Sequence, residues 1–316
     1  MNEVLRGLEF CYAYIDDLPI ASSSPEEHLH HLRLVLERLS EHGIVINVPK
    51  SQFGVSALDF LGHRVDSLGI RPLEDKVQAI QNFPQPTTQR KLREFLGMVN
   101  FYRRFVPNCA TILHPLNTLL SKTNSNAKTL VWCDAAITAF QQAKDALAEA
   151  TLLVHPKSEA PTRIMTDASN VAVGAVLEQY VNDQWSPISY FSKALKPAEI
   201  KYSTFDRELL AIYLAIKHFR YFVEGRHFHV STDHKPLIYA LPGRPDKYSP
   251  RQVRHLDFIA QFTSDIRHIK GSNNAVADAL SRMEVSALDA DTSPPVIDLR
   301  AMAEAQVQDP DLQGQQ

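Results

Sequence analysis

Apolar positions in the first eighty residues predict short strands around one amphipathic helix. Residues 9–20 predict two short strands, a hairpin turning at an acidic pair, and Pro19 weakens the second because proline cannot donate a ladder hydrogen bond. The helix is expected to begin at Ser24, with Glu27 completing a capping box, and to end at Gly43. Its expected buried stripe is Leu29, Leu32, Leu36 and Leu39. Two further runs have strand-like patterns: Ile44–Val48 and Leu58–Val65.

The middle of the chain predicts helices joined by proline-rich and polar connections. A joint at residues 83–86 precedes a helix that is capped by Thr87 or Thr88 and ended by Pro107. Its apolar positions recur at helical spacing: Leu92, Phe95, Leu96, Val99, Tyr102 and Val106. Five cations surround that apolar face: Arg90, Lys91, Arg93, Arg103 and Arg104. A polar linker and another amphipathic helix follow: residues 121–129 and 134–149.

From Thr162 the pattern changes to strands followed by interleaved helices. This order predicts an α/β domain with a mixed sheet. The expected strands are Thr162–Asp167, Val171–Gln179, Ser186–Phe191, His227–Asp233 and Phe262–Ile269. The expected helices are Thr204–Val223, Pro250–Gln261 and Asn274–Arg282. After Val285 the chain is rich in Ala, Asp, Gln and Pro without periodicity, which is typical of a disordered tail.

Composition narrows the class of protein. The chain has 316 residues, 44% of them hydrophobic, which suggests two or three domains with ordinary cores. The net charge of −3 means that any nucleic-acid-binding surface must be local. Three separated cysteines favour a reducing compartment over a disulfide framework. No membrane-spanning run or signal-peptide pattern is present, so we expect a soluble, intracellular protein.

Four carboxylates in the second half occupy strand ends or core-facing helix positions: Asp167, Glu208, Asp233 and Asp278. Drawn from four elements, they could converge on one pocket, where divalent cations would relieve their mutual repulsion. Oxygen ligands favour Mg²⁺ or Mn²⁺, and two such ions suit phosphodiester hydrolysis. The alternative is that each acid is a helix cap or a surface charge, and spacing alone leaves this open.

Two other groups of residues, an aspartate pair and a histidine cluster, are also candidates for binding a metal ion. Asp16 and Asp17 lie in an apolar run, where paired carboxylates are costly unless a cation neutralises them. Three histidines on the first helix have no cysteine nearby, and they predict a solvated helix face rather than a metal site. These histidines are His28, His30 and His31.

The chain contains a series of short motifs, each of which is weak evidence for a family alone but which together occur in a specific order. They are Tyr14-Ile15-Asp16-Asp17, Phe60-Leu61-Gly62-His63, Leu92-Arg93-Glu94-Phe95-Leu96-Gly97, Tyr102-Arg103-Arg104-Phe105, Thr166-Asp167-Ala168-Ser169, Glu208-Leu209-Leu210-Ala211, Thr232-Asp233-His234 and Ala277-Asp278-Ala279-Leu280-Ser281-Arg282. With them, residues 3–285 resemble the reverse transcriptase–ribonuclease H portion of a Ty3/gypsy-type LTR retrotransposon Pol polyprotein. The resemblance implies an α+β and α/β multidomain chain: a partial palm with a β-hairpin and helix, a helical thumb, and a ribonuclease H-like mixed five-stranded sheet.

The resemblance implies a polymerase role for the first part of the chain. Asp16 and Asp17 are similar to palm metal-binding aspartates, and Lys50 is similar to the palm lysine near the incoming nucleotide, with a solvated loop lysine as the alternative. The helix at 88–106 resembles the thumb, whose cations would contact duplex phosphates, with a solvated charged face as the alternative. Phe60, Leu61 and Gly62 resemble the primer grip.

For the second part, the resemblance implies that Asp167, Glu208, Asp233 and Asp278 are the catalytic acids of a ribonuclease H. They would hold two Mg²⁺ or Mn²⁺ ions and hydrolyse the RNA strand of an RNA–DNA hybrid. His268 is a weaker candidate for proton transfer, because it lies in a strand-like run. The expected partners are an RNA–DNA hybrid, a template–primer duplex, and either a second copy or the rest of Pol. The expected location is the cytoplasm or a virus-like particle.

The resemblance also sets expected boundaries and limits on activity. The expected regions are palm 1–83, thumb 84–125, connection 126–160, ribonuclease H 161–285 and tail 286–316. A third palm aspartate and the fingers would lie upstream of Met1, so we expect the chain to be a fragment without polymerase activity. The alternatives are a non-catalytic nucleic-acid-binding remnant and a nonfunctional translation product.

Overall fold

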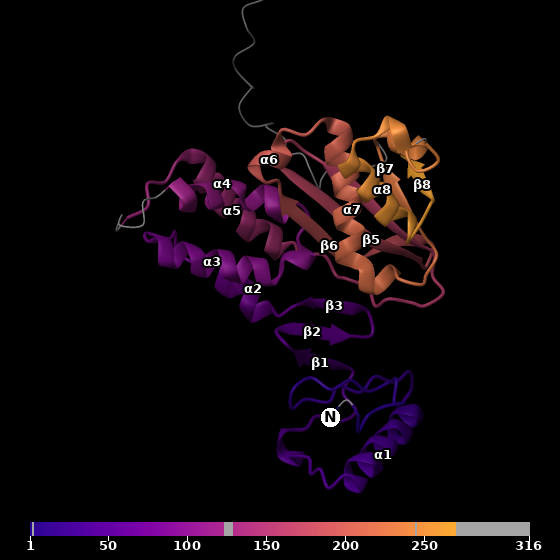
Figure 1. Ribbon diagram of the computed structural model, residues 1–316. Helices are drawn as coiled ribbons and strands as arrows, with labels where there is room; N and C mark the ends of the chain where they lie inside the picture. The colour runs from indigo at the N-terminus through magenta and orange to yellow at the C-terminus, as the bar shows by residue number, and fades with distance from the viewer. Residues whose placement is uncertain (2, 123–128, 244, 270–316) are drawn as a thin grey trace, which may run out of the picture. The chain divides into compact units, whose positions relative to one another are not determined.

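The structure is a computed structural model that describes residues 1–269 except residues 2, 123–128 and 244 (Figure 1). Its chain divides into two compact units, Met1–Lys76 and the part from Val77 onward. The expected helix at Asn274–Arg282 and the expected tail lie outside the described residues. Among the described residues, none of the helices combines the length and apolarity that crossing a membrane requires.

In the first unit, the acidic pair lies at a hairpin turn. Tyr14 and Asp17 exchange backbone hydrogen bonds of 2.9 Å, and Tyr12 N–H donates to Pro19 at 3.2 Å. The predicted hairpin is therefore confirmed, but its arms form isolated bridges rather than the two strands we expected. Ile15 adopts a left-handed φ of 53° at the turn, which is uncommon for a β-branched residue.

Helix α1 (Pro25–Glu41) begins and ends as predicted, but its buried face differs. Ser24 caps the helix, whereas Glu27 reaches back to Ser23 rather than to Ser24. Leu39 is buried as expected, but Leu29 and Leu36 are exposed, so this part of the expected leucine stripe is wrong. Val35 is buried beside Leu39, because the helix turns that side towards a small apolar cluster built by the hairpin.

A three-stranded antiparallel sheet, of order β1-β2-β3, completes the first unit. Its strands are β1 (Ala57–Phe60), β2 (His63–Asp66) and β3 (Gly69–Pro72). The expected strand at Ile44–Val48 is wrong: this run is irregular and leads into the 3₁₀ helix η1 (Val48–Lys50), because its isoleucines pack on the cluster without a strand partner. Helix α2 (Glu74–Gln81), which the sequence pattern missed, spans the division between the units.

The second unit opens with three α-helices and a short 3₁₀ turn. They are α3 (Gln89–Phe101), η2 (Arg103–Phe105), α4 (Cys109–Lys122) and α5 (Asp134–Ala148). Thr88 is the N-cap, and the six predicted apolar positions of this segment are all buried. The helix nevertheless ends at Phe101 rather than at Pro107, because the chain tightens into η2. Phe95 packs on Phe140 of α5, with ring centroids 4.5 Å apart.

A five-stranded mixed sheet of order β6-β5-β4-β7-β8 confirms the predicted architecture. The strands are β4 (Thr162–Ala168), β5 (Ala172–Val181), β6 (Gln184–Ala194), β7 (Phe228–Thr232) and β8 (Ile266–His268). The remaining helices are α6 (Pro197–Ile200), α7 (Thr204–Val223), η3 (Lys235–Tyr239), η4 (Pro245–Lys247) and α8 (Pro250–Ala260).

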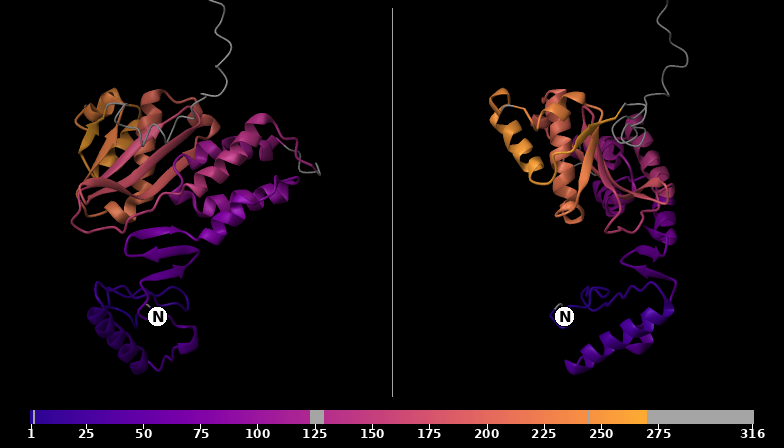
Figure 2. Two further views of the ribbon diagram at one scale, coloured as in Figure 1. Left: turned by 180° about the vertical axis from the view of Figure 1, so that it is seen from behind. Right: turned by 90° about the vertical axis from the view of Figure 1, so that its right-hand side faces the viewer.

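The core of this unit lies where α7 and α8 cover the sheet. Ile164 of β4, Leu177 of β5 and Val230 of β7 are fully buried against α7 residues such as Ile212 and Ile216. The right-hand view in Figure 2 shows the sheet between α7 and α8 on one side and the earlier helices on the other. Strands β4 and β7 run parallel, so both end at the same edge of the sheet.

Candidate active site

Three of the four predicted carboxylates meet at that edge. Asp167 lies near the end of β4, Asp233 follows β7, and Glu208 lies in the second turn of α7. One carboxylate oxygen from each lies within 4.8 Å of the others. Asp167 and Glu208 are buried and Asp233 is partly buried, so the group is set into the protein rather than spread on its surface. Asp278 lies outside the described residues.

The electrostatics of the group centre on Glu208. Burial, followed by the charges of Asp167 and Asp233, raises the pKa of Glu208 to about 9. A hydrogen bond of 3.1 Å from Ala168 N–H to Oε1 opposes this rise. Among the described residues, Oε2 of Glu208 is buried without a hydrogen-bond partner. A buried oxygen of this kind costs free energy unless a proton or a cation satisfies it.

The carboxylates line a cavity of about 350 Å³. Five other lining residues were not predicted as site residues: Ala168, Ser169, Asn170, Thr204 and His234. Their positions next to Asp167 and Asp233, or at the start of α7, were the available signal. Ser169 Oγ accepts hydrogen bonds from the backbone N–H groups of Val171 and Ala172, which fixes the turn after β4.

Two helix N-termini are tied together beside this cavity. Ser203 caps α7 and Ser249 caps α8. Asp206 accepts hydrogen bonds from Ser203 Oγ and Gln252 Nε2, both at 2.8 Å, and pairs with Arg251 at 3.0 Å. This network holds the first turn of α7, and therefore the backbone that carries Glu208, against α8.

His268 lies near the candidate site by strand register. It is an exposed residue of β8 whose Cα partner is Thr232, the residue before Asp233. Ile269 N–H donates to Thr232 O at 3.0 Å, so the pairing extends to the end of β7. His268 therefore lies in a strand, as expected, and its role in proton transfer stays a prediction.

The polymerase-like residues of the first unit lie on two hairpins. Asp16 and Asp17 are exposed at the turn of the first, and Phe60 and Leu61 lie at the turn of the second. The ring of Tyr14 packs edge-on against Phe60, with centroids 6.0 Å apart. Within the described residues, the single group of three metal-ligating side chains includes neither aspartate.

The other predicted residues of this unit are also accessible. Lys50 is exposed at the end of η1, as expected for either interpretation of this lysine. Leu61 and Gly62 both adopt left-handed φ angles, 48° and 78°, which produce the tight β1–β2 turn. Leu61 is exposed at this turn.

The five predicted phosphate-contacting cations fall into two sets. Arg90, Lys91 and Arg93 are exposed on α3, where Lys91 pairs with Glu94 at 3.0 Å and Arg93 bonds Gln89. Arg103 and Arg104 belong to η2 instead and pack at the ribonuclease H-like sheet. Arg103 Nη2 donates to the carbonyl oxygen of Ser192 in β6.

The histidine cluster on α1 is not the solvated face that we expected. His28 and His31 are partly buried, and both Nδ1 atoms bond Ser22 Oγ, at 3.1 and 2.9 Å. The ring of His31 stacks on Phe10 with centroids 3.6 Å apart. His30 is exposed. The correction follows from the rotation of α1, which turns His28 and His31 towards the hairpin.

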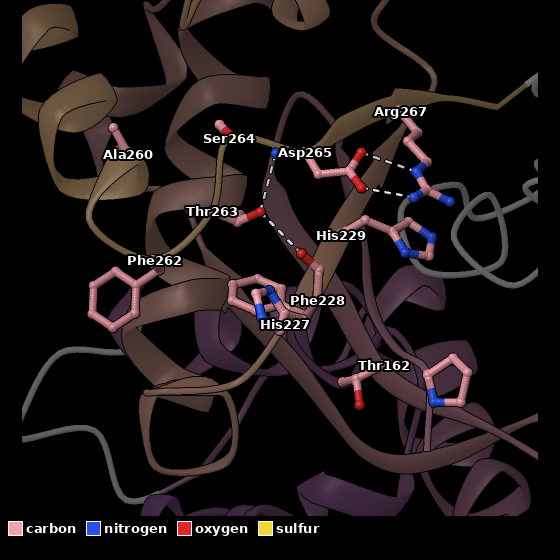
Figure 3. Close-up of a pocket in the computed structure, with 11 residues that line it drawn as sticks. Thr162, His227, Phe228, His229, Ala260, Phe262, Thr263, Ser264, Asp265 and Arg267 are labelled. Atoms are coloured by element: carbon pink, nitrogen blue, oxygen red, sulfur yellow. Dashed lines mark hydrogen bonds and ion pairs between the residues drawn. The ribbon is translucent and has the colours of Figure 1, made fainter. Parts of the chain in front are cut away.

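A larger cavity lies at the other end of the sheet. It has a volume of about 540 Å³ and includes Thr162 and Phe228, the first residues of β4 and β7. Figure 3 shows Asp265 and Arg267 facing each other across two hydrogen bonds at its rim. Its one carboxylate is therefore already paired, and this cavity lacks the converging acids of the smaller one.

Two family models match separate parts of the chain. Residues 1–65 match "Reverse transcriptase (RNA-dependent DNA polymerase)". Residues 132–230 match "RNase H-like domain found in reverse transcriptase", and they include the three converging carboxylates. The polymerase-like hairpin and the buried acidic group therefore fall in different family models.

The curated relatives agree with both matches. The chain is 38% identical over 290 residues to the retrovirus-related Pol polyprotein from transposon 297 of Drosophila melanogaster, covering 90% of the chain. It is 34% identical over 273 residues to the transposon Tf2-3 polyprotein of Schizosaccharomyces pombe, covering 85% of the chain. The chain carries reverse transcriptase and ribonuclease H-like domains homologous to those of transposon Pol polyproteins. It spans 26% of the length of the first of these relatives and 20% of the second.

Solved structures share the fold of this Pol region. A foamy viral protease–reverse transcriptase dRH in complex with double-stranded DNA superposes with a TM-score of 0.72 at 22% identity, covering 85% of this chain and 47% of that one. A foamy viral protease–reverse transcriptase in complex with an RNA/DNA hybrid gives a TM-score of 0.70 at 24% identity, covering 85% of this chain and 36% of that one. These likenesses establish the fold of the reverse transcriptase and ribonuclease H-like domains.

Proposed function

We propose that the ribonuclease H-like domain hydrolyses the RNA strand of an RNA–DNA hybrid, with Asp167, Glu208, Asp233 and Asp278 as its catalytic acids. The observation that carries the proposal is the buried group of three carboxylates, in which the pKa of Glu208 is raised to about 9. The ligand set contains only oxygen, and a buried Glu208 oxygen has no partner among the described residues, which fits Mg²⁺ or Mn²⁺. When bound, two such ions would supply an activated water and stabilisation of the leaving oxygen.

The residues of this chain would prepare the site for that chemistry. Glu208 and Asp167 present their oxygens from rigid elements, because α7 is capped and clamped to α8 and β4 is central in the sheet. Asn170 and His234 flank the acids and are placed to contact a bound strand. Recognition of a hybrid would depend on the 2′-OH of the RNA, which a DNA duplex lacks.

The test is cleavage of end-labelled RNA in a hybrid with Mg²⁺, comparing the full chain with Asp167→Asn. We expect the variant to lose cleavage and chelation to stop the wild type. Asp183→Asn is the matched control, since Asp183 lies in an exposed turn with a φ of 61° that asparagine tolerates. Equal cleavage by wild type and Asp167→Asn would refute the assignment.

A second candidate function is non-catalytic binding of nucleic acid. The exposed cations of α3 favour a surface that could bind a duplex without cutting it. Equal affinity for a hybrid with and without Mg²⁺, together with no cleavage, would support this alternative. Retention of a buried three-carboxylate group favours the enzyme, because such a group destabilises the folded protein unless it has a use.

For the reverse transcriptase region we propose descent from an RNA-directed DNA polymerase, with Asp16 and Asp17 as metal ligands and Lys50, Phe60, Leu61 and Gly62 near the template–primer. We propose the palm, thumb, connection and ribonuclease H boundaries given above as functional regions. The structure divides the chain between Lys76 and Val77 and keeps the thumb-like helices in one unit with the ribonuclease H-like sheet. Membership of the Ty3/gypsy subgroup stays a prediction. So do association with a second copy or with the rest of Pol, and a location in the cytoplasm or in a virus-like particle.

A further inference from the structure

The first turn of α8 contacts α7 at the residues just before Glu208. Asp206 of α7 accepts a hydrogen bond from Gln252 Nε2 at 2.8 Å and pairs with Arg251 at 3.0 Å, both through Oδ1. The guanidinium of Arg251 also lies 3.8 Å from the ring centroid of Tyr202, which is two residues before α7. We call Asp206, Arg251 and Gln252 the α7–α8 clamp.

The segment at the start of α8 also reaches the loop that carries Asp233. The ring of Phe205 in α7 stacks on Tyr248, two residues before α8, with centroids 6.1 Å apart and an angle of 10° between the planes. Phe205 also packs edge-on against His234, with centroids 5.9 Å apart. Since His234 directly follows Asp233, this segment is connected to both of the elements that bring Glu208 and Asp233 to the candidate site.

The position of Glu208 depends mainly on the backbone of α7. Its Oε1 accepts one hydrogen bond, 3.1 Å long, from Ala168 N–H, and among the described residues Oε2 has no partner. The distances from Glu208 to Asp167 and Asp233 therefore follow the position of the first turns of the helix. Because a binding constellation has to be held to within about 0.5 Å, a small shift of these turns would disturb three oxygens that lie within 4.8 Å of one another.

The clamp is not needed to keep α7 folded. Ser203 Oγ already caps the helix by accepting a hydrogen bond from Asp206 N–H at 3.1 Å. The apolar face of α7 holds the helix on the sheet through five buried side chains: Leu209, Ile212, Ala215, Ile216 and Phe219. The pair between Arg251 and Asp206 is partly exposed, and pairs of that kind contribute little to stability. Its effect is therefore expected on position rather than on folding.

We propose that the α7–α8 clamp positions Glu208 relative to Asp233 and so sets the affinity of the carboxylate group for a divalent cation. Asp206 acts through the helix backbone and is not a further ligand, because residues two apart on a helix do not face each other. Removing a residue that orients the ligands of a metal site from behind typically costs about 10–100-fold in metal affinity or activity. The inference rests on the proposed function for the use of this site, but metal affinity can be measured without a substrate.

The test is binding of Mn²⁺ by the full chain without nucleic acid, with free Mn²⁺ measured by electron paramagnetic resonance. We expect the double variant Arg251→Gln, Gln252→Ala to bind Mn²⁺ about tenfold more weakly, because Asp206 loses both contacts with α8. Removing a positive charge by itself would strengthen cation binding, so weaker binding has the sign of a positional effect. Arg251→Lys should bind as the wild type does, since lysine keeps the charge opposite Asp206.

The matched control is the double variant Arg220→Gln, Gln261→Ala, which makes the same chemical changes at the other ends of α7 and α8. Both side chains are exposed, and Arg220 pairs with Glu224 at 2.6 Å. We expect this control to bind Mn²⁺ with wild-type affinity. Equal weakening in both double variants would overturn the proposal, because the effect would then not depend on the clamp.

Hybrid cleavage gives a second measurement. We expect the clamp variant to need about tenfold more Mg²⁺ for half-maximal cleavage. The KM for the hybrid should stay unchanged, because the cavity of the carboxylates is not lined by any clamp residue. A raised KM with wild-type Mn²⁺ affinity would overturn the proposal and identify the clamp as a contact for nucleic acid.

Thermal melts in chelator identify a variant that fails to fold, and in that case Gln252→Ala by itself carries the test, with weaker Mn²⁺ binding again expected. Wild-type Mn²⁺ affinity in a folded clamp variant would overturn the proposal. If the clamp variant binds Mn²⁺ more weakly but the wild type leaves the hybrid intact, the proposed function fails and the clamp keeps its role. If the wild type cleaves the hybrid and the clamp variant binds Mn²⁺ normally, only the role of the clamp fails.

Discussion

Replacing Glu208 by glutamine should stabilise the metal-free protein. Its folded-state pKa of about 9 lies far above the ordinary 4.5, so the folded state binds a proton that the unfolded state releases at neutral pH. A pH of about 7.5 lies about three units above the unfolded-state pKa of 4.5, so the proton released on unfolding corresponds to about 4 kcal/mol against folding. Glutamine keeps the size of the side chain and an oxygen for Ala168 N–H, but it removes the ionisation that favours the unfolded state.

The sign of the pH dependence follows from the same shift. Because the folded pKa is raised, the wild type loses stability as pH rises from about 4.5 to about 9, and Glu208→Gln should lack this decline. In chelator near neutral pH we expect the midpoint of thermal unfolding to rise by about 8–16 °C in the variant. Added Mg²⁺ should stabilise the wild type and have little effect on Glu208→Gln, because the variant has lost a ligand charge.

Glu199→Gln supplies a control of opposite sign. Burial raises the pKa of Glu199, but the hydrogen bonds from Lys196 and Lys193 outweigh it and leave the pKa below its usual value. This carboxylate therefore stabilises the folded state above about pH 4.5, so its glutamine variant should be less stable at neutral pH. Calorimetry in chelator tests both variants. A Glu208→Gln protein no more stable than wild type, with an unchanged pH profile, would refute the electrostatic argument.

Two further predictions concern other parts of the chain. Ser249→Ala should lower the free energy of unfolding by about 1 kcal/mol, because Ser249 Oγ caps Gln252 N–H, and Ser249→Asp should restore it; denaturant unfolding is the measurement. The chain should give no full-length primer extension on an RNA template with Mg²⁺, because the described residues gather no third carboxylate around Asp16 and Asp17. Robust extension by wild type that Asp16→Asn abolishes would contradict this second expectation.

The periodicity of apolar residues was sufficient to predict helix and strand bounds wherever a segment packs on a broad core. The α7 helix begins and ends where its pattern predicts, and β4 and β7 each end within one residue of an aspartate because their apolar runs end there. It failed for α1, where leucines and histidines both recur at helical spacing and the pattern allows two buried faces. The hairpin against which α1 packs decides between them, and that choice depends on contacts between segments distant in sequence.

The sequence by itself determined the order of the strands and long helices in the ribonuclease H-like sheet, the Pol ancestry and the identity of the candidate acids. Those properties are encoded locally, in residue types, spacing and short motifs. Only the tertiary structure decided that Asp167, Glu208 and Asp233 share one pocket, and that burial and the neighbouring charges raise the pKa of Glu208 to about 9. Burial and charge–charge interaction depend on distances between separate elements, and those distances exist only once the sheet and helices have packed.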